Sequence, residues 1–191
     1  MPDTSGMDLT SPNYTIRRAT PEDAAGIAAI YNGYVETTII SFETAPVSVE
    51  EMGRRIQDRL ASYDWLVAER QGQLIGYAYY GQFRARAAYD HVVESTVYIA
   101  KDAVGQGVGR RLYADIIESA QAKGFREILG VIALPNDASE QLHARMGFVL
   151  VGRLPRVGYK FGRYIDVSFW QWSLPEAIDN DTPTTRSEET N

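Results

Sequence analysis

Three glycines in five residues stand between an expected strand and an expected helix, in the stretch Gly105-Gln106-Gly107-Val108-Gly109. In such a place backbone amides can point at an anion, because glycine permits positive φ angles and a close approach of the chain. Arg110 and Arg111 follow in the first helical turn, where positive charge opposes the helix dipole unless an anion lies there. A plain glycine-rich turn with two solvated arginines would look the same, so the pattern alone leaves both interpretations open.

The spacing of this loop narrows the choice of anion. A nucleotide-binding P-loop needs lysine followed by Ser or Thr after its last glycine, and this chain has two arginines there. A dinucleotide-binding fingerprint needs Gly-x-Gly-x-x-Gly and an acid that ends the next strand, but here Glu127 starts that strand. Nucleotide hydrolysis and hydride transfer therefore fit poorly, and a diphosphate carrier such as coenzyme A remains.

Two side chains could move protons. Glu94 stands inside an otherwise uncharged strand pattern, and partial burial would raise its pKa toward the value that a general base needs. A solvent-facing glutamate on a half-exposed sheet is the common alternative. His143 lies in a short helical pattern and can exchange a proton near neutral pH, although a histidine there can also simply pack. His91, just before the Glu94 strand, has a weaker claim.

The composition excludes several classes of protein. The 191 residues include no cysteine, which rules out disulfides, thiolate metal sites and cysteine nucleophiles, and two histidines are too few for a histidine-rich metal site. The net charge of −6 lies entirely in the two ends, because residues 14–175 hold 18 basic and 18 acidic residues. We therefore expect no nucleic-acid partner. No apolar run reaches the roughly 18 residues of a spanning helix and no secretory signal is visible, so we expect a cytoplasmic protein without a membrane partner.

The elements that must position these residues form one expected domain, 14–175, between disordered tails at 1–13 and 176–191. Hydrophobic patterns and capping signals predict strands and helices in the order β-α-α-β-β-β-α-β-α-β-β. The expected strands are 14–18, 65–69, 74–80, 91–99, 128–133, 148–154 and 165–174. The expected helices begin at 21, 48, 108 and 139. This order predicts an α+β (mixed α/β) fold, with a mixed sheet and helices on both faces.

At the glycine loop the sequence resembles the GNAT superfamily of N-acetyltransferases. Their pyrophosphate loop, Gln/Arg-x-x-Gly-x-Gly/Ala, falls on residues 104–109, with Val104 in place of the usual Gln or Arg. Further motifs resemble the branch of phosphinothricin N-acetyltransferases and of enzymes acting on methionine sulfoximine or methionine sulfone. These motifs stand at 63–69, 84–90, 94–98, 131–137 and 166–171, so the resemblance covers the whole expected domain.

The resemblance implies a GNAT fold with a mostly antiparallel central sheet, acetyl-CoA as co-substrate and no metal. It implies acetylation of the α-amine of a small amino acid analogue, such as phosphinothricin, methionine sulfoximine or methionine sulfone, which would confer detoxification or resistance. Because no cysteine can form an acyl-enzyme, we expect direct attack in a ternary complex. The family also implies a homodimer.

The resemblance assigns roles to single residues as well. Glu94 would deprotonate the amine, directly or through water, and His143, where the superfamily often has tyrosine, would protonate or stabilise the leaving thiolate. Solvent exposure explains Arg145 equally well, and a turn that starts a helix explains Asn136. The residues implied to bind the cofactor are Val97, Tyr98, Ile99, Gly105, Gln106, Gly107, Val108, Gly109, Arg110, Asn136 and Arg145.

The acceptor would be held by the loop that precedes the Glu94 strand. Carboxylate and phosphinate oxygens prefer guanidinium forks and hydroxyl donors, although arginines in loops are usually just solvated. Phe42 would form a wall along the acceptor, with core packing as its alternative. The expected acceptor residues are Phe42, Arg84, Arg86, Ala87, Ala88, Tyr89 and Glu94.

Two other functions compete with this hypothesis. One is an acetyltransferase for a polyamine or a protein N-terminus; a polyamine would need an acidic pocket, and the Arg84 and Arg86 loop argues against it. The other is a CoA-binding sensor without transfer activity, which the presence of both Glu94 and Asn136 disfavours.

Overall fold

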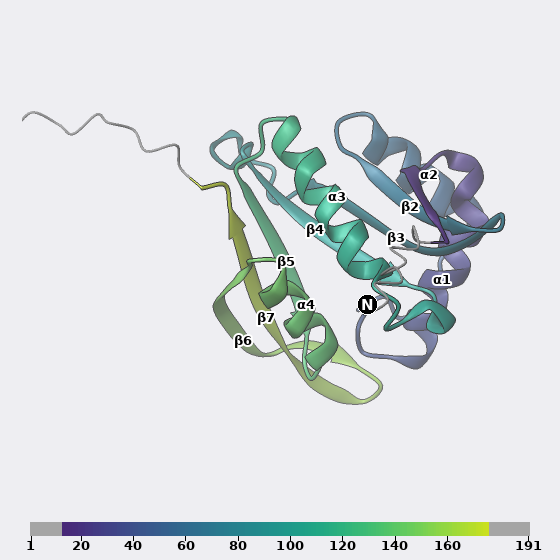
Figure 1. Cartoon of the computed structure of the whole chain (residues 1–191). Coiled ribbons are helices and arrows are strands. Elements are labelled where there is room, and N and C mark those ends of the chain that lie inside the picture. Colours follow the sequence, from purple (N-terminus) through teal and green to yellow (C-terminus); the bar gives the residue numbers. More distant parts are fainter. Residues whose placement is uncertain (1–12, 176–191) are drawn as a thin grey trace, which may run out of the picture.

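Seven strands form one mixed sheet in the order β1-β2-β3-β4-β5-β7-β6, and four α-helices pack on it in this computed structural model (Figure 1). The structure describes residues 13–175. The strands are β1 (Thr15–Arg18), β2 (Trp65–Arg70), β3 (Gln73–Gln82), β4 (Val92–Ile99), β5 (Glu127–Ala133), β6 (Val149–Lys160) and β7 (Arg163–Ser173). The helices are α1 (Ala24–Thr37), α2 (Val49–Leu60), α3 (Val108–Ala122) and α4 (Asp137–Arg145), and short 3₁₀ turns lie at Pro21–Asp23, Ala87–Tyr89 and Lys101–Ala103.

Side chains cap two of these helices at their N-termini. The Ser48 hydroxyl accepts a hydrogen bond from the Glu51 amide at 3.1 Å at the start of α2. The Asn136 side-chain oxygen accepts one from the Ser139 amide at 3.2 Å at the start of α4. Each cap satisfies one of the amides that a helix start leaves without an intrahelical partner. Neither α1 nor α3 has a side-chain cap or an acidic residue in its first turn, and α3 follows the glycine loop directly.

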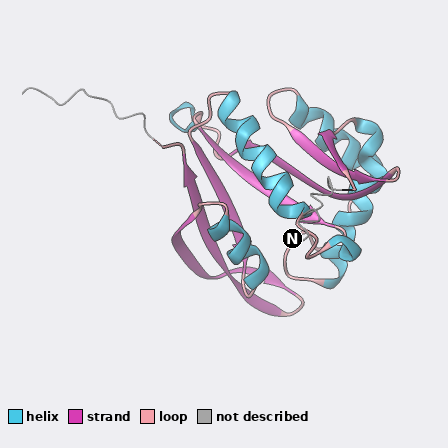
Figure 2. Cartoon of the chain, in the orientation of Figure 1, coloured by secondary structure: helices cyan, strands magenta, loops and turns pink. Residues whose placement is uncertain are grey.

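The helices cover both faces of the sheet (Figure 2). One buried cluster lies between α3 and the sheet, and it includes Leu112, Ile116 and Phe148. A second cluster lies beneath α1 and α2 and includes Ile27, Ile56 and Tyr77. These two apolar layers account for the expected fold class, which the structure confirms: a mixed α/β fold whose sheet is mostly antiparallel.

The pair β4 and β5 interrupts the antiparallel pattern. These two strands run parallel, and they pair only from Val92 opposite Glu127 to Ser95 opposite Gly130. Beyond that point β4 continues to Ile99 and β5 to Ala133 without pairing to each other, and Figure 1 shows the two strands diverging. Backbone groups of residues 96–99 that face β5 are therefore not used by the sheet on that side, which opens a wedge-shaped cleft between the strands.

The last hairpin is longer than the sequence predicted. The sequence predicted a strand that ends at Leu154, but β6 continues to Lys160 through two irregularities in its pairing with β7, at Leu150/Gly152 and Leu154/Gly158. An edge strand tolerates proline and bulges because one of its sides has no ladder to complete. The predicted tails lie, apart from Asn13, outside the described residues. Among the described helices, none has the length and apolar character needed to cross a membrane.

Candidate active site

A buried chain of hydrogen bonds marks the point where β4 and β5 separate. The hydroxyls of Ser95 on β4 and Tyr113 on α3 lie 2.7 Å apart, and the Tyr113 hydroxyl lies 2.8 Å from Nε2 of His143 on α4. The Ser95 hydroxyl also reaches the Leu129 carbonyl at 3.1 Å. A small cavity of about 80 Å³, lined in part by Ser95, His143 and Asn136, opens beside this chain. The predicted residues His143 and Asn136 therefore meet at the apex of the cleft.

The surroundings of His143 fix its protonation. Its Nδ1 lies 2.8 Å from the Ser139 carbonyl, which can only accept, so Nδ1 carries the proton and Nε2 accepts from the Tyr113 hydroxyl. Burial lowers the pKa of His143, and the Ser139 carbonyl opposes that change. A neutral ring with both nitrogens engaged is a poor proton donor. The predicted role of His143 as an acid stays a prediction, and this geometry weighs against it.

Gly130 on β5 makes room for this histidine. A Cβ at position 130 would overlap the imidazole of His143 and would lie 3.4 Å from the Tyr113 hydroxyl. The last residue of β5 that pairs with β4 therefore has to be small if the ring is to sit against the strand. No sequence pattern indicated that Gly130 and His143 lie together, because they belong to different elements.

Glu94 lies on the opposite face of β4 from Ser95, toward α2, and its side chain is partly buried. Burial raises the pKa of Glu94, while the positive charges of Arg59 and Arg84 oppose that rise. A carboxylate with a raised pKa beside the cleft suits a general base. Of the residues near it, Arg84 belongs to the predicted acceptor loop, but Arg59 on α2 was missed. Gly81 on β3, directly opposite Glu94 in the sheet, was missed as well.

The glycine loop has the backbone that its sequence predicted. Gly105 and Gly107 have φ angles of 81° and 80°, a conformation that other residues adopt at a cost of about 1–2 kcal/mol. Gly107 directly precedes α3, whose first amides have no side-chain cap. Gln106 accepts a hydrogen bond at 2.7 Å from Arg70 on β2, a contact that the sequence did not suggest. Arg110 is exposed in the first turn, so a positive charge lies on the same helix turn as the free amides that could receive an anion.

The remaining predicted cofactor residues lie around the cleft. Val97 and Ile99 pack partly against the α3 cluster, and the ring of Tyr98 packs among tyrosines of α1 and β3. The Ile99 carbonyl already accepts a hydrogen bond at 2.6 Å from the Tyr34 hydroxyl, another residue that sequence reasoning missed. Arg145 is exposed on α4, where it makes no polar contact with the described residues.

The predicted acceptor loop borders a larger groove on the face of the sheet that carries Glu94. The groove measures about 700 Å³, and α-helices of the described chain do not line it. Arg84 stacks on Phe83 at 4.9 Å, and Tyr89 meets the same ring edge-on at 5.8 Å. Arg86 and Ala87 are exposed and do not line the groove. Its walls include Arg84, Ala88, Tyr89, His91, Leu129, Leu154, Phe169 and Gln171.

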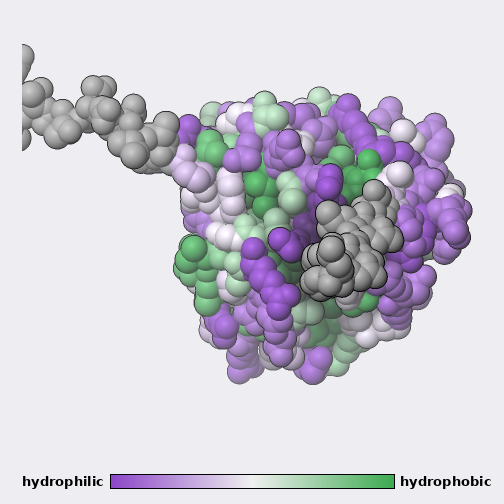
Figure 3. Space-filling view, in the orientation of Figure 1, coloured by the Kyte–Doolittle hydropathy of each residue, from purple (hydrophilic) through white to green (hydrophobic). Residues whose placement is uncertain are grey.

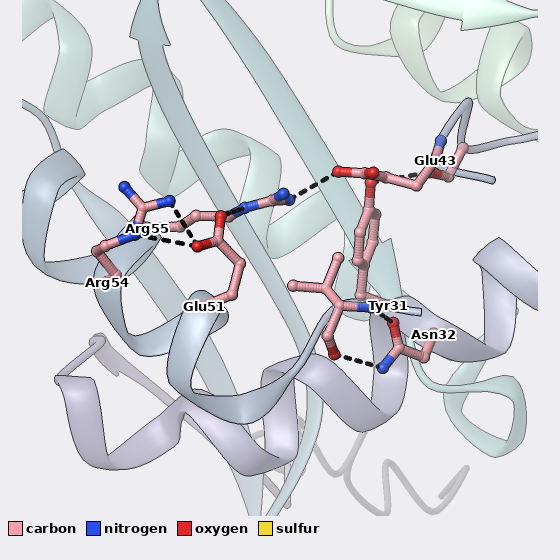
Figure 4. A network of polar contacts seen from close by, with 8 residues as sticks. Tyr31, Asn32, Glu43, Glu51, Arg54 and Arg55 are labelled. Carbon is pink, nitrogen blue, oxygen red and sulfur yellow. Dashed lines mark hydrogen bonds and ion pairs between the residues drawn. The ribbon is translucent and has the colours of Figure 1, made fainter. Parts of the chain in front are cut away.

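Phe42 lies in the loop between α1 and α2, 41% exposed, with its ring over Gly158 of β6. Several bonds hold this loop in place. The Lys160 ammonium, buried at the end of β6, donates to the Ser41 carbonyl at 2.6 Å, and the Tyr31 hydroxyl lies 2.8 Å from the Ser41 hydroxyl. Figure 4 shows the link to α2, in which Arg55 joins Glu43 of the loop to Glu51. Phe42 is therefore presented by a fixed loop beside the last hairpin.

Comparison with known proteins identifies the family of this chain. Residues 16–169 match the family model described as the acetyltransferase (GNAT) domain. The chain belongs to the GNAT acetyltransferase family. It is 44% identical to a phosphinothricin N-acetyltransferase of Streptomyces viridochromogenes over 159 residues, which cover 82% of this chain and 85% of the relative. It is 38% identical to an L-methionine sulfoximine/L-methionine sulfone acetyltransferase of Pseudomonas aeruginosa, over 84% of this chain and 94% of the relative.

Among solved structures, a GNAT superfamily phosphinothricin acetyltransferase from Sinorhizobium meliloti, in complex with AcCoA, superposes with a TM-score of 0.82. It is 33% identical and matches 91% of this chain and 97% of its own. This GNAT protein is therefore an N-acetyltransferase, as the sequence predicted. Within residues 13–175, no three His, Cys, Asp or Glu side chains gather as they would around a metal ion.

Proposed function

We propose that this GNAT protein transfers the acetyl group of acetyl-CoA to the α-amine of a small amino acid analogue of the phosphinothricin, methionine sulfoximine or methionine sulfone type. The names of its relatives support the acceptor class. The observation that carries the proposal is Glu94, a partly buried carboxylate beside the cleft, whose pKa is raised by burial and whose neighbours Arg59 and Arg84 can receive an acidic acceptor. Detoxification of such analogues is the role that this activity would serve.

The proposed reaction is direct attack in a ternary complex. Acetyl-CoA supplies a thioester whose carbonyl carbon is attacked by the amine: the C–N bond forms, the C–S bond breaks, and the leaving thiolate takes the second proton that the attacking nitrogen loses as it becomes an amide. Glu94 removes the proton that the ammonium must lose before it can attack. Burial raises the pKa of Glu94, which makes its carboxylate a stronger base.

The loop at the start of α3 is the proposed place for the pyrophosphate of acetyl-CoA. Its residues fit, because two glycines with positive φ and the uncapped amides of α3 present donors to an anion. The free edge of residues 97–99 offers backbone groups for an extended ligand to pair with, in the manner of an added strand. Asn136 uses its side-chain oxygen as a helix cap, which leaves its amide nitrogen free to donate into the cleft. Arg110 adds positive charge nearby, and we assign Arg145 to the same role.

The acceptor is proposed to lie on the Glu94 face, between the Arg84–Tyr89 loop and Phe42. Arg84 and Tyr89 line the groove on this face, whereas Arg86 and Ala87 are exposed and do not line it. A guanidinium and a phenol suit oxygen-rich acceptors and disfavour polyamines. Glu127 supplies the one carboxylate in the lining of the described groove, so this groove has no acidic cluster that would attract a polyamine.

A panel of acceptors tests the proposal. Thiol release from acetyl-CoA is measured with phosphinothricin, methionine sulfoximine, methionine sulfone, glutamate, spermidine and a short peptide. Saturable turnover on the first three compounds is expected. Turnover on spermidine or the peptide alone would keep the family and overturn the acceptor class. CoA binding without any turnover would favour a sensor.

We also propose a homodimer, formed through β6. This edge strand exposes apolar side chains along most of its length, including Val149 at 65%, Val151 at 54% and Val157 at 58%. A green patch at the left edge of Figure 3 lies where Figure 1 places this strand. A long apolar edge strand invites pairing with another chain. Sedimentation equilibrium should give twice the mass of one chain. Val151→Lys should lower this mass, and a wild-type monomer at micromolar concentration contradicts the proposal.

A further inference from the structure

Arg59 is the one arginine of α2 without an acidic neighbour at helical spacing. Arg54 pairs with Glu51 and Asp58, and Arg55 pairs with Glu51 and Glu43, as Figure 4 shows in part. The guanidinium of Arg59 makes no hydrogen bond or ion pair with any described residue, although its side chain is partly buried. It stacks instead on the ring of Tyr79 at 4.9 Å.

Gly81 on β3 gives this guanidinium its place. A Cβ at position 81 would overlap Nη1 of Arg59, so the charged group lies in the notch that the missing side chain leaves. Gly81 is the direct cross-strand partner of Glu94. Opposed Cβ positions in a sheet are about 5 Å apart, so the Arg59 guanidinium lies beside the Glu94 side chain on the same face.

The two charges are neighbours but do not pair: no contact within ion-pair distance joins Arg59 to Glu94 among the described residues. A base and a cation held side by side in this way match a zwitterion, whose ammonium and carboxylate are attached to one carbon. The ammonium can face Glu94 while the carboxylate faces the open donors of Arg59.

We propose that Arg59, whose guanidinium lies in the notch at Gly81, binds the α-carboxylate of the acceptor and so orients the amine toward Glu94. This inference rests on the proposed function, because it names how that site recognises an α-amino acid. Specificity for amino acids over simple amines would then depend on residues of α2 and β3 as well as on the Arg84 loop.

The test compares methionine sulfone with methionine sulfone amide, which keeps the amine and the side chain but lacks the carboxylate. Steady-state kcat/KM is measured on both compounds for the wild type, Arg59→Gln, Gly81→Ala and the control Arg54→Gln. The wild type should prefer the acid, and Arg59→Gln should reduce that preference roughly tenfold or more, as expected when a charge-assisted bond is lost. Gly81→Ala should act in the same direction because its methyl group displaces the guanidinium. Arg54→Gln should keep the preference.

A binding measurement separates this inference from the proposed function. Calorimetric titration of methionine sulfone into the CoA-bound protein should show weaker binding for Arg59→Gln than for the wild type. If the wild type binds the compound in this way but acetylates nothing, the proposed function fails and the inference stands. If Arg59→Gln lowers kcat/KM equally for the acid and the amide, with unchanged binding, Arg59 acts only on Glu94 and the inference is overturned.

Discussion

Removal of one buried hydroxyl, in Tyr113→Phe, should destabilise the protein more than its size suggests. Tyr113 is fully buried, and its hydroxyl is the partner of Nε2 of His143 at 2.8 Å and of the Ser95 hydroxyl at 2.7 Å. After the substitution Ser95 can still donate to the Leu129 carbonyl, but Nε2 keeps no protein partner. An unsatisfied buried acceptor costs about 1–3 kcal/mol, to which the lost bond adds. We therefore expect the free energy of unfolding to fall by about 2–3 kcal/mol.

Tyr80→Phe is the matched control, because Tyr80 is equally buried and also hydrogen-bonded. Its loss leaves no group without a partner: the Ser119 hydroxyl still donates to Asp64 at 2.6 Å, and Asp64 keeps its ion pair with Lys123. We expect a cost of about 1 kcal/mol or less. Urea unfolding followed by circular dichroism measures the free energy of unfolding of both variants. In a thermal scan Tyr113→Phe should melt roughly 4–12 °C below the wild type. Equal losses for the two variants would refute the reasoning about His143.

Three further predictions concern the site. Gly107→Ala should raise the KM for acetyl-CoA and lower the free energy of unfolding by about 1–2 kcal/mol, because its φ is 80°; an unchanged KM in steady-state assays would remove the loop from cofactor binding. The acidic limb of the pH profile of kcat/KM should have its midpoint above the ordinary glutamate pKa of about 4.3, because burial raises the pKa of Glu94. Arg59→Gln removes a positive charge that opposes this rise, so the midpoint should move to higher pH, and a midpoint that moves to lower pH contradicts the assignment. Gly158→Ala should displace the Phe42 ring and raise the acceptor KM roughly fivefold, with the acetyl-CoA KM as internal control; equal changes in both would mean a general disturbance.

Sequence patterns predicted the elements well where the signal is local. The Ser48 cap, the glycines before α3 and the apolar alternation of β4 each depend on a few neighbouring residues, and the structure has a helix or strand at each place. The length of β6 could not be predicted from Pro155, because pairing with β7 overrides the local preference at an edge.

The site was predictable only in part, for a physical reason. Glu94 stood out because a charge inside an apolar strand is rare, but Arg59 and Gly81 matter through a register between β3 and β4 that no short motif encodes. One signal was present: Arg59 is the arginine of its helix with no acid three or four residues away. Likewise the sequence identified His143, but only the Ser139 and Tyr113 contacts show that both of its ring nitrogens are engaged.

The most direct test of the central claim is kcat/KM for acetyl transfer to methionine sulfone in Glu94→Gln, with Glu118→Gln as the control for an exposed glutamate of α3. Loss of a general base should lower the value about 10²- to 10⁴-fold while calorimetry shows unchanged binding of acetyl-CoA. The control variant should match the wild type. A Glu94→Gln enzyme that keeps wild-type kcat/KM near neutral pH would contradict the account, because the amine would then lose its proton without this carboxylate.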